Sequence, residues 1–169
     1  MTDEKKYKIV VFGAFGSGKT TLVQTLDPES RHVEADCAGG TTTVALDYGR
    51  LQVNGVSVYL FGTPGQERFE FAREIISKGM DGAILLVDAT SIPDDFTTHL
   101  YGSLSSANVP LVVFLNKCET IGANPELWKK EFGASPVWTV SALDKKQSTR
   151  ALSNFVETLP SPARGHNNT

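Results

Sequence analysis

The sequence is poor in cysteine and histidine, and no targeting segment can be recognised in it. Only Cys37 and Cys118 occur in 169 residues, which is too few for the disulfide framework of a small secreted domain. The histidines are His32, His99 and His166, and none has metal-ligand spacing to another His or to Cys. The charged opening MTDEKKYK does not resemble a secretory signal. These absences predict a reduced, cytoplasmic location, and they assign no metal site or catalysis to these residues.

Long apolar runs and excess positive charge are also missing. No run approaches the roughly 20 apolar residues that a membrane span needs, and the formal net charge is -3. Residue 2 is Thr and the tail PSPARGHNNT has no Cys, so the signals for myristoylation and prenylation are absent. We therefore expect no intrinsic membrane anchor and no nucleic-acid binding by bulk electrostatics, and any anionic ligand must be held locally.

The chain does contain enough apolar residues, 40% of the total, to build one ordinary domain. We expect a single domain over 1–169, with its core at about 7–159 and a disordered tail at 160–169. Apolar β-branched runs alternate with helical stretches. This order is typical of an α/β fold in which helices cover both faces of a mostly parallel sheet.

The sequence predicts six strands and five helices. The strands are expected at 8–12, 43–53, 56–61, 82–89, 111–116 and 136–140. The helices are expected at Lys19–Leu26, Glu67–Lys78, Pro93–Ala107, Pro125–Phe132 and Ser148–Thr158. Asn54 and Gly55 form the signature of a tight hairpin between the second and third strands. That pair is therefore antiparallel, and the sheet is mixed.

A glycine-rich loop, GAFGSGKT, follows the first strand and opens the first helix. It satisfies the phosphate-loop pattern G-x-x-x-x-G-K-[ST] in the structural context which that pattern requires. Glycines at three positions let successive backbone N–H groups approach a polyphosphate, and the helix N-terminus adds positive potential. The expected nucleotide-binding residues of this segment are Gly13, Phe15, Gly16, Ser17, Gly18, Lys19, Thr20 and Thr21.

Two side chains of the loop have specific expected roles. Lys19 supplies a point charge to the β- and γ-phosphates, and the Thr20 hydroxyl is a ligand for Mg²⁺, which prefers oxygen. The alternative is a glycine-rich turn with no ligand. A lysine in the first turn of a helix argues against that alternative because its charge opposes the helix dipole.

The base-recognition residues are expected at the ends of the fifth and sixth strands, in LNKCE and VSAL. A carboxylate at Glu119 can accept two hydrogen bonds, which suits the N1–H and the exocyclic amine of guanine. Adenine presents an acceptor at N1 and does not match. Glu119 therefore favours a guanine nucleotide.

With these motifs, residues 7–159 resemble the Ras-like small GTPases, whose base loop reads N-K-x-D and whose last loop reads S-A-K. The segment GTPGQERF has a Pro where the eukaryotic members usually have Ala. In this respect the chain resembles the bacterial and archaeal branch, which includes the Mgl-type regulators. The resemblance implies a phosphate-loop G-domain fold that binds GTP or GDP with Mg²⁺. Glu119 departs from the family, which has Asp at that position.

The resemblance also implies how the base is held. Asn116 orients the loop and touches the purine, the stem of Lys117 lies along the ring, and the Ala142 N–H donates to the guanine carbonyl. Ser141 and Leu143 flank that contact. The alternative is that Asn116 and Lys117 simply end a strand.

In such GTPases a Thr of the first switch closes over Mg²⁺ when the γ-phosphate is present. The segment AGGTTTVALDYG assigns this role to Thr43, with Thr42 second, and Gly39 and Gly40 allow the backbone to move. The alternative is that these β-branched residues only open a strand.

The second switch is FGTPGQERF. By resemblance, Gln66 orients the attacking water and is catalytic together with Lys19, and the Gly65 N–H contacts the γ-phosphate. Gly62 stands where relatives have an acid that helps to hold Mg²⁺. Asp88 is one candidate to replace that acid, although a local hydrogen-bond acceptor is the favoured interpretation.

Phe15 also departs from the family, which has a small residue there. Its ring is expected to obstruct an arginine finger from an activator, so that unaided GTP hydrolysis is slow. An arginine in cis could substitute, and Arg31, Arg68 and Arg73 are candidates, although solvated surface charges are favoured.

The expected partners are an activator, an exchange factor and an effector, all bound through the switches. The resemblance suggests roadblock-type partners and a monomer that can dimerise in the GTP state. Phe71 leaves apolar surface for such a partner. Two alternatives are a nucleotide-gated binding module with negligible hydrolysis and a nucleotide-dependent kinase.

Overall fold

The structure is a computed structural model that describes residues 4–37, 42–66 and 69–162. Its elements are listed in chain order: β1 (Lys6–Phe12), α1 (Lys19–Leu26), β2 (Arg31–Cys37), β3 (Thr42–Val53), β4 (Val56–Gly62), α2 (Glu70–Ser77), β5 (Gly82–Asp88), α3 (Asp95–Ser105), β6 (Leu111–Asn116), α4 (Pro125–Glu131), β7 (Val137–Thr139) and α5 (Lys145–Thr158). The α/β fold predicted from the sequence is confirmed.

The strands form one mixed sheet in the order β2-β3-β4-β1-β5-β6-β7. β1 pairs in parallel with β4 and β5, and β6 pairs in parallel with β5 and β7. β3 is antiparallel to both of its neighbours, β2 and β4. The predicted hairpin is present, because Asn54 and Gly55 both have positive φ, at 50° and 77°, as a two-residue turn between twisted strands requires.

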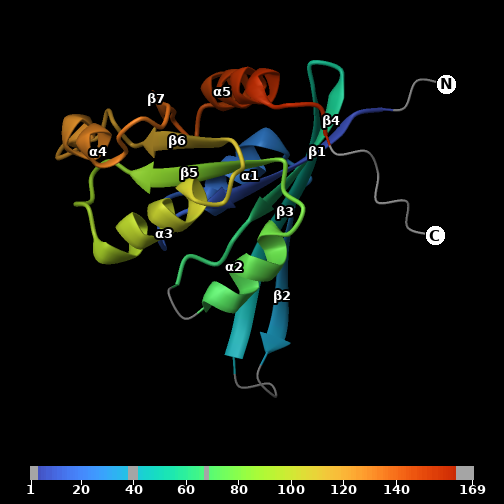
Figure 1. Cartoon of the computed structure of the whole chain (residues 1–169), viewed down its shortest axis with the longest axis horizontal. Coiled ribbons are helices and arrows are strands. Elements are labelled where there is room, and N and C mark those ends of the chain that lie inside the picture. Colours follow the sequence, from blue (N-terminus) through green and yellow to red (C-terminus); the bar gives the residue numbers. More distant parts are fainter. Residues whose placement is uncertain (1–3, 38–41, 67–68, 163–169) are drawn as a thin grey trace.

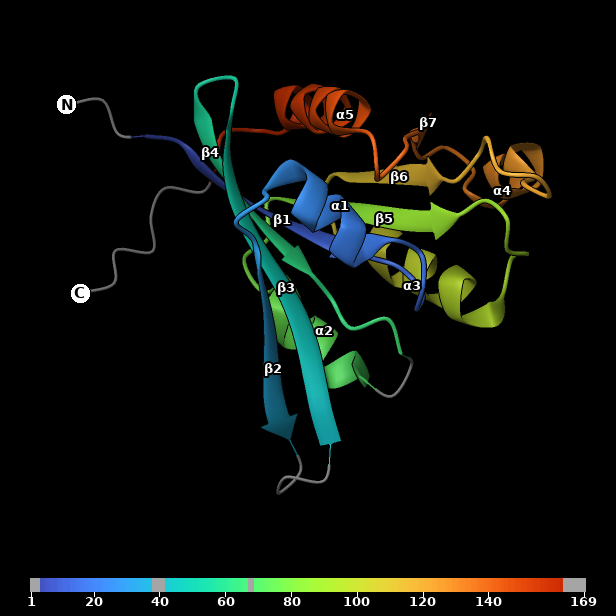
Figure 2. The ribbon, with the colours of Figure 1, turned by 180° about the vertical axis from the view of Figure 1, so that it is seen from behind.

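Helices cover both faces of the sheet. α1 and α5 pack on one face, where Leu22, Leu152 and Phe155 meet Ile9 and Val11 (Figure 2). α3 and α4 pack on the other face with α2 beside them, against the alternate side chains of the same strands (Figure 1). The two-residue period of a strand sends successive side chains of β1 into opposite cores. No helix within the described ranges is long and apolar enough to cross a bilayer.

The prediction of six strands is wrong by one, because the described part of the chain contains seven. The strand missed from the sequence is β2, whose residues RHVEADC contain little of the apolar alternation that marks a half-buried strand. β2 is an edge strand held by its pairing with β3, and exposed charged side chains are common at such edges. The hairpin of β2 and β3 extends away from the body of the domain in both ribbon views (Figures 1 and 2).

Candidate functional site

An open cleft of about 600 Å³ lies at the carboxyl ends of the parallel strands, which is where open α/β sheets bind ligands. Its volume is in the range of small-molecule sites. Most of the predicted nucleotide-binding residues line it: Phe15, Gly16, Gly18, Lys19, Thr20, Thr21, Gly65, Asn116, Lys117, Glu119, Ser141, Ala142 and Leu143. The predicted residues Gly13, Ser17 and Gln66 are not part of the lining.

Thr43 is the remaining residue that the sequence predicts to bind the nucleotide. Its backbone lies in β3 opposite Asp36, and its side chain is outside the described part of the structure, as are Gly39 and Gly40. The strand backbone at Thr42 and Thr43 agrees with the alternative that they open a strand, and the Mg²⁺ role of Thr43 stays a prediction.

Gly18 is required by the path of the phosphate loop into α1. Its φ of +107° is a conformation that L side chains rarely adopt. A Cβ at this position would also lie 2.6 Å from Asn116 Nδ2. The loop can therefore approach the base-recognition residues only through a glycine.

Lys19 is buried under the phosphate loop. Its ammonium donates to the carbonyls of Gly13 and Ala14, at 2.7 Å and 2.9 Å. Burial lowers the Lys19 pKa to about 8, with Asp47 acting in the opposite direction and Arg73 adding to the decrease. A polyphosphate beside the ammonium would favour the charged form, so the site is electrostatically suited to an anion.

The second switch closes directly onto the phosphate loop at Gly65. The Phe15 N–H donates to the Gly65 carbonyl at 3.1 Å. A Cβ on residue 65 would lie 2.6 Å from Phe15 N and 2.7 Å from Lys19 Nζ. Glycine is therefore needed at 65 for the two loops to meet, and the narrow space between them is lined by the loop backbone and the Lys19 ammonium.

The Phe15 side chain is 81% exposed at the mouth of the cleft. Its location beside Gly65 is compatible with the predicted obstruction of an arginine finger.

Asn116 joins three loops of the site. Its Nδ2 donates to the Ser17 carbonyl at 3.0 Å, and its Oδ1 accepts from the N–H groups of Lys117 and Ala142, each at 3.0 Å. Asn116 is buried, so these backbone groups depend on it in place of water. The Ala142 N–H, predicted to donate to guanine, is engaged with Asn116 in this structure.

Lys117 links the base loop to the phosphate loop. Its ammonium donates to the Gly16 carbonyl at 3.2 Å and pairs with Asp88 at 3.0 Å. Asp88 also accepts from the Thr90 N–H and hydroxyl, and it does not line the cleft. Asp88 is thus a local acceptor, and the structure does not bring it to Thr20 as a metal ligand.

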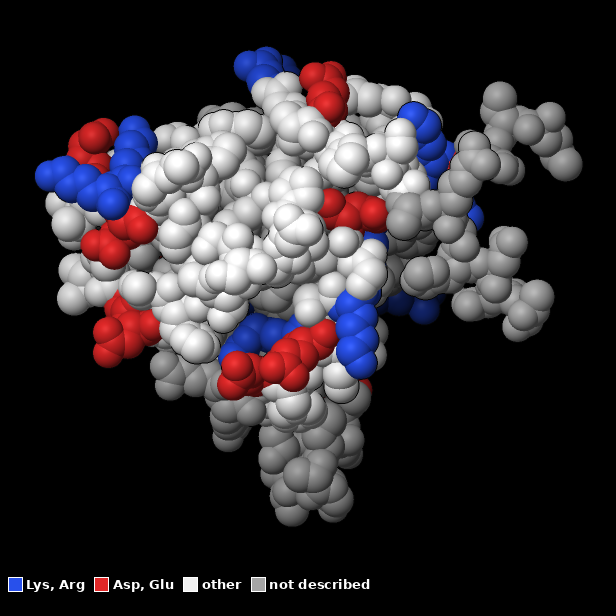
Figure 3. Space-filling view, viewed as in Figure 1, with Lys and Arg blue, Asp and Glu red and all other residues white. Residues whose placement is uncertain are grey.

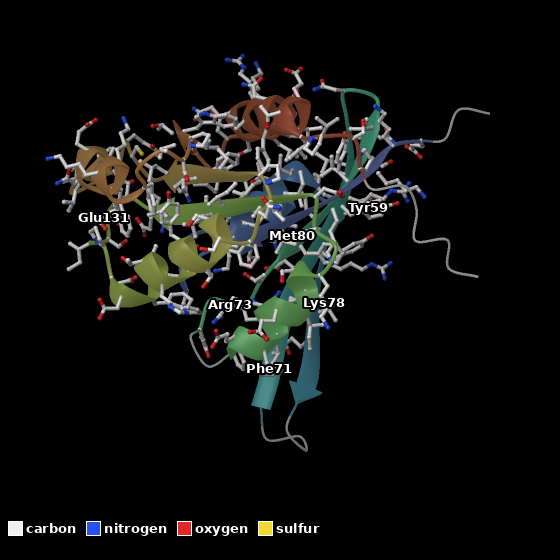
Figure 4. The ribbon with its side chains drawn as sticks, viewed as in Figure 1. Tyr59, Phe71, Arg73, Lys78, Met80 and Glu131 are labelled. Carbon is white, nitrogen blue, oxygen red and sulfur yellow. The ribbon has the colours of Figure 1, made fainter. Side chains whose placement is uncertain are left out.

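The structure corrects the interpretation of Arg73 as a solvated surface charge. Arg73 is 7% exposed, and its guanidinium donates to the carbonyls of Pro64 and Gln66, at 3.1 Å and 2.7 Å. It also lies over the Phe96 ring of α3, at 5.1 Å, whereas the exposed Phe71 lies elsewhere on α2 (Figure 4). Arg73 therefore fixes the backbone of the second switch.

The other two candidate arginines differ from Arg73. Arg31 is exposed on β2, as a surface charge would be. Arg68 lies outside the described residues. On the face shown in Figure 3, basic and acidic side chains of the described residues lie in small groups separated by uncharged surface, and neither sign forms a continuous patch there.

Sequence reasoning missed several residues that line the cleft, and two of them carry ionisable side chains: His32 on β2 and Asp47 on β3. Asp47 is 7% exposed. Its Oδ2 accepts from the Thr20 hydroxyl at 2.6 Å, and its Oδ1 lies 2.8 Å from His32 Nδ1. The hydrogen bond with the Asp47 carboxylate raises the pKa of His32. The only sequence signal was Asp47's place in the strand that follows the first switch.

The oxygen atoms at and beside Thr20 are suited to bind a magnesium ion that also binds the phosphates of a nucleotide. Within the described ranges, no group of three His, Cys, Asp or Glu side chains is arranged to hold a metal by itself. Mg²⁺ usually binds one or two protein oxygens together with substrate phosphates and water. The Thr20 hydroxyl and the Asp47 carboxylate, both on the cleft, fit that pattern.

Ser17 gives a prediction about stability. Its Oγ is the only buried side-chain N or O atom without a hydrogen-bond partner among the described residues. Because an unpaired buried hydroxyl is costly, Ser17→Ala is expected to raise the free energy of unfolding by about 1 kcal/mol. Urea unfolding of the nucleotide-free protein measures this change.

Ser148 is the matched control, since it is equally buried but its hydroxyl donates to the Ser141 carbonyl at 2.9 Å. Ser148→Ala should lower the free energy of unfolding. A decrease for both variants would contradict the interpretation of Ser17.

Comparison with known proteins supports the same fold and family. The protein-family model of the elongation factor Tu GTP binding domain matches residues 4–161. An uncharacterised Methanocaldococcus jannaschii protein, MJ1339, is 38% identical over 112 residues, which are 66% of this chain and 70% of that protein. Translation initiation factor IF-2 of Mesoplasma florum is 32% identical over 123 residues, which are 73% of this chain but only 19% of the factor.

Solved structures show the same architecture at low identity. The G domain of the Thermotoga maritima FeoB iron transporter has a TM-score of 0.67 at 20% identity, covering 90% of this chain and 98% of that one. The Arl6 small GTPase of Trypanosoma brucei, with a bound nucleotide analogue, has a TM-score of 0.64 at 21% identity, covering 90% and 96%. With its phosphate loop, base loop and mixed sheet, the chain belongs to the family of GTP-binding domains that is represented by the one in elongation factor Tu.

Proposed function

We propose that this protein is a small regulatory GTPase that binds GTP and GDP with Mg²⁺ and hydrolyses GTP slowly. The observation that carries the proposal is the convergence of three loops on one cleft. The phosphate loop, the Asn116–Glu119 loop and the Ser141–Leu143 loop all line it. Asn116 hydrogen-bonds to the first and the last of these loops, so the phosphate and base subsites are built as one unit.

Selection of guanine is assigned to Glu119, which lines the cleft from an exposed position. Its carboxylate can accept from both N–H donors on one edge of guanine. An adenine nucleotide presents an acceptor there and would leave the carboxylate unpaired. This difference also argues against the kinase alternative with ATP as substrate.

The chain's own residues contribute mainly charge stabilisation and positioning. Lys19 stabilises negative charge on the β- and γ-phosphates, and Gly65 closes the second switch over them. Gln66 is proposed to orient the attacking water. Arg73 binds the Gln66 carbonyl and thereby limits where that residue can move. When bound, Mg²⁺ neutralises phosphate charge.

Switching is proposed to involve the β2–β3 hairpin and the segment from Gly62 to α2. β2 has a hydrogen-bonded neighbour on one side only, because it is the sheet edge. Edge strands are held by fewer interactions than central ones, so this strand can respond to the nucleotide at a lower cost. Thr43, at the start of β3, is then proposed to reach Mg²⁺ in the GTP state.

The partners and the location follow from the resemblance in the sequence. An activator, an exchange factor and an effector are proposed to bind the switches, where Phe71 and Ile75 of α2 are exposed. Roadblock-type partners, a GTP-dependent dimer, a cytoplasmic location and membership of the Mgl-type branch are parts of the same proposal.

Titration calorimetry with Mg²⁺ tests the nucleotide assignment. GDP and a non-hydrolysable GTP analogue should bind, and ADP should bind at least about 100-fold more weakly because it leaves the Glu119 carboxylate without its two N–H donors. Hydrogen exchange across β2 and α2 should differ between the GDP and GTP-analogue states. Equal binding of ADP and GDP would refute the base assignment, and identical exchange in the two states would refute the switch.

Phe15 favours the second candidate, a binding module with negligible hydrolysis, because its exposed ring stands at the mouth of the cleft. Phe15→Gly is expected to hydrolyse GTP at least about tenfold faster than the parent when an activator is present, since an arginine finger then gains access. Single-turnover phosphate release, with and without added lysate, measures this.

The control is Ile92→Ala, which truncates a similarly exposed apolar side chain elsewhere. It should leave phosphate release unchanged. If Phe15→Gly also leaves it unchanged under both conditions, the ring is not an obstruction.

A further inference from the structure

We propose that Asp47 supplies the magnesium-binding carboxylate that position 62 lacks. The inference rests on the proposed function, because the ion in question is the one that accompanies GTP or GDP. The second switch begins at Gly62, which has no side chain to offer. The structure places a different acid, from the neighbouring strand, in the same space.

The strand register brings the two positions together. Asp47 of β3 lies directly opposite Gly62 of β4 in the antiparallel pair. A Cβ on residue 62 would lie 3.2 Å from Asp47 Cβ and 3.4 Å from Asp47 Oδ2. An acid at 62 would therefore compete for the volume that the Asp47 side chain fills. Glycine at 62 and aspartate at 47 form one compensating pair.

The Asp47 carboxylate points at the expected metal ligand on the phosphate loop. Its Oδ2 accepts from the Thr20 hydroxyl at 2.6 Å. Asp47 and Thr20 both line the cleft, and Asp47 acts on the pKa of Lys19 through its charge. One carboxylate and one hydroxyl next to a polyphosphate subsite are the protein donors that a nucleotide-bound Mg²⁺ uses.

His32 holds the other carboxylate oxygen. Its Nδ1 lies 2.8 Å from Asp47 Oδ1, so Oδ1 and Oδ2 are directed to different partners. Carboxylates that bind metals are commonly oriented by such a second hydrogen bond. The competing candidate, Asp88, has its oxygens engaged by Thr90 and Lys117. Asp47 is the acid that is both oriented and adjacent to Thr20.

The test compares the parent with Asp47→Asn, which keeps the shape and hydrogen-bonding capacity of the side chain but removes its charge. The readout is the dissociation rate of a fluorescent GDP, measured with excess Mg²⁺ and with chelator. In the parent, Mg²⁺ should slow dissociation. In Asp47→Asn this slowing should shrink at least tenfold, while the rate in chelator stays close to the parent rate. The affinity of Mn²⁺ for the GDP complex, followed by electron paramagnetic resonance, should fall in parallel.

A double variant that moves the acid from position 47 to position 62 tests the same role of Asp47 independently. Asp47→Ala combined with Gly62→Asp returns an acid to the second switch and frees the space that it needs, so the magnesium effect should recover. Glu34→Gln is the matched control, because it removes a nearby exposed acid that does not line the cleft. It should leave the magnesium effect unchanged.

The outcomes separate this inference from the proposed function. GDP binding by Asp47→Asn with an undiminished magnesium effect would overturn the role of Asp47 and leave the GTPase proposal intact. A failure of the swap to recover any magnesium effect, in a folded protein that binds GDP, would also overturn it. A parent protein that binds no guanine nucleotide, with or without Mg²⁺, would overturn the proposed function itself.

Discussion

Lys19→Met is expected to weaken GTP and GDP binding about 100- to 1000-fold, because it removes charge-assisted hydrogen bonds worth several kcal/mol together. The ammonium lies under the phosphate loop and its pKa is lowered to about 8 by burial. A bound phosphate would stabilise the charged form of Lys19, which burial disfavours. Titration calorimetry at neutral pH, where the amine is still charged, measures the loss.

The same substitution should change the stability of the nucleotide-free protein by less than about 1 kcal/mol, because two contributions oppose each other. Met removes a charge that burial disfavours, but it also leaves the Gly13 and Ala14 carbonyls without their donor. A loss of binding that came only from unfolding would appear in a urea titration. Lys146→Met, at an exposed position on α5, is the control and should bind nucleotide like the parent.

Asn116→Ala is expected to lower the free energy of unfolding by about 3 kcal/mol, because it leaves three backbone groups without partners. Those groups belong to Ser17, Lys117 and Ala142, in three different loops. Nucleotide affinity should fall as well, since the loops are no longer held together. Urea unfolding and calorimetry measure the two effects on the same samples.

Asn124→Ala is the matched control. Asn124 caps α4 with one exposed hydrogen bond, to the Leu127 N–H. Its loss should cost about 1 kcal/mol and leave nucleotide binding unchanged. Similar stability losses for the two variants, with unchanged GDP binding in both, would show that Asn116 does not connect the subsites.

The position of Asp47 could have been deduced from the sequence, although its role could not. The predicted Asn54–Gly55 turn fixes the register of β3 against β4, because a two-residue hairpin allows only one pairing. Counting outward from that turn pairs residue 47 with residue 62, as observed. Asp47 is therefore the side chain that stands opposite the glycine at the position where relatives have an acid.

The burial of Arg73 and the presence of β2, by contrast, could not have been deduced from the sequence. Arg73 lies between Ala72 and Glu74 in a segment with other charged residues, and nothing local distinguishes it from a solvated charge. It is buried because the carbonyls of the second switch and the ring of Phe96 meet it from elsewhere in the chain. β2 forms because β3 offers it an edge, and its own residues have no strong strand pattern.

The sequence by itself determined the phosphate loop, the base loop, the hairpin and the α/β order of elements. These features depend on residues that are close together in the chain, where glycine conformations, turn chemistry and apolar periodicity act directly on the local backbone. The tertiary structure decided the seventh strand, the burial of Arg73 and the contact between Asp47 and Thr20. Each of these depends on which distant segments pack against one another, and that packing sets the burial and partners of a polar side chain.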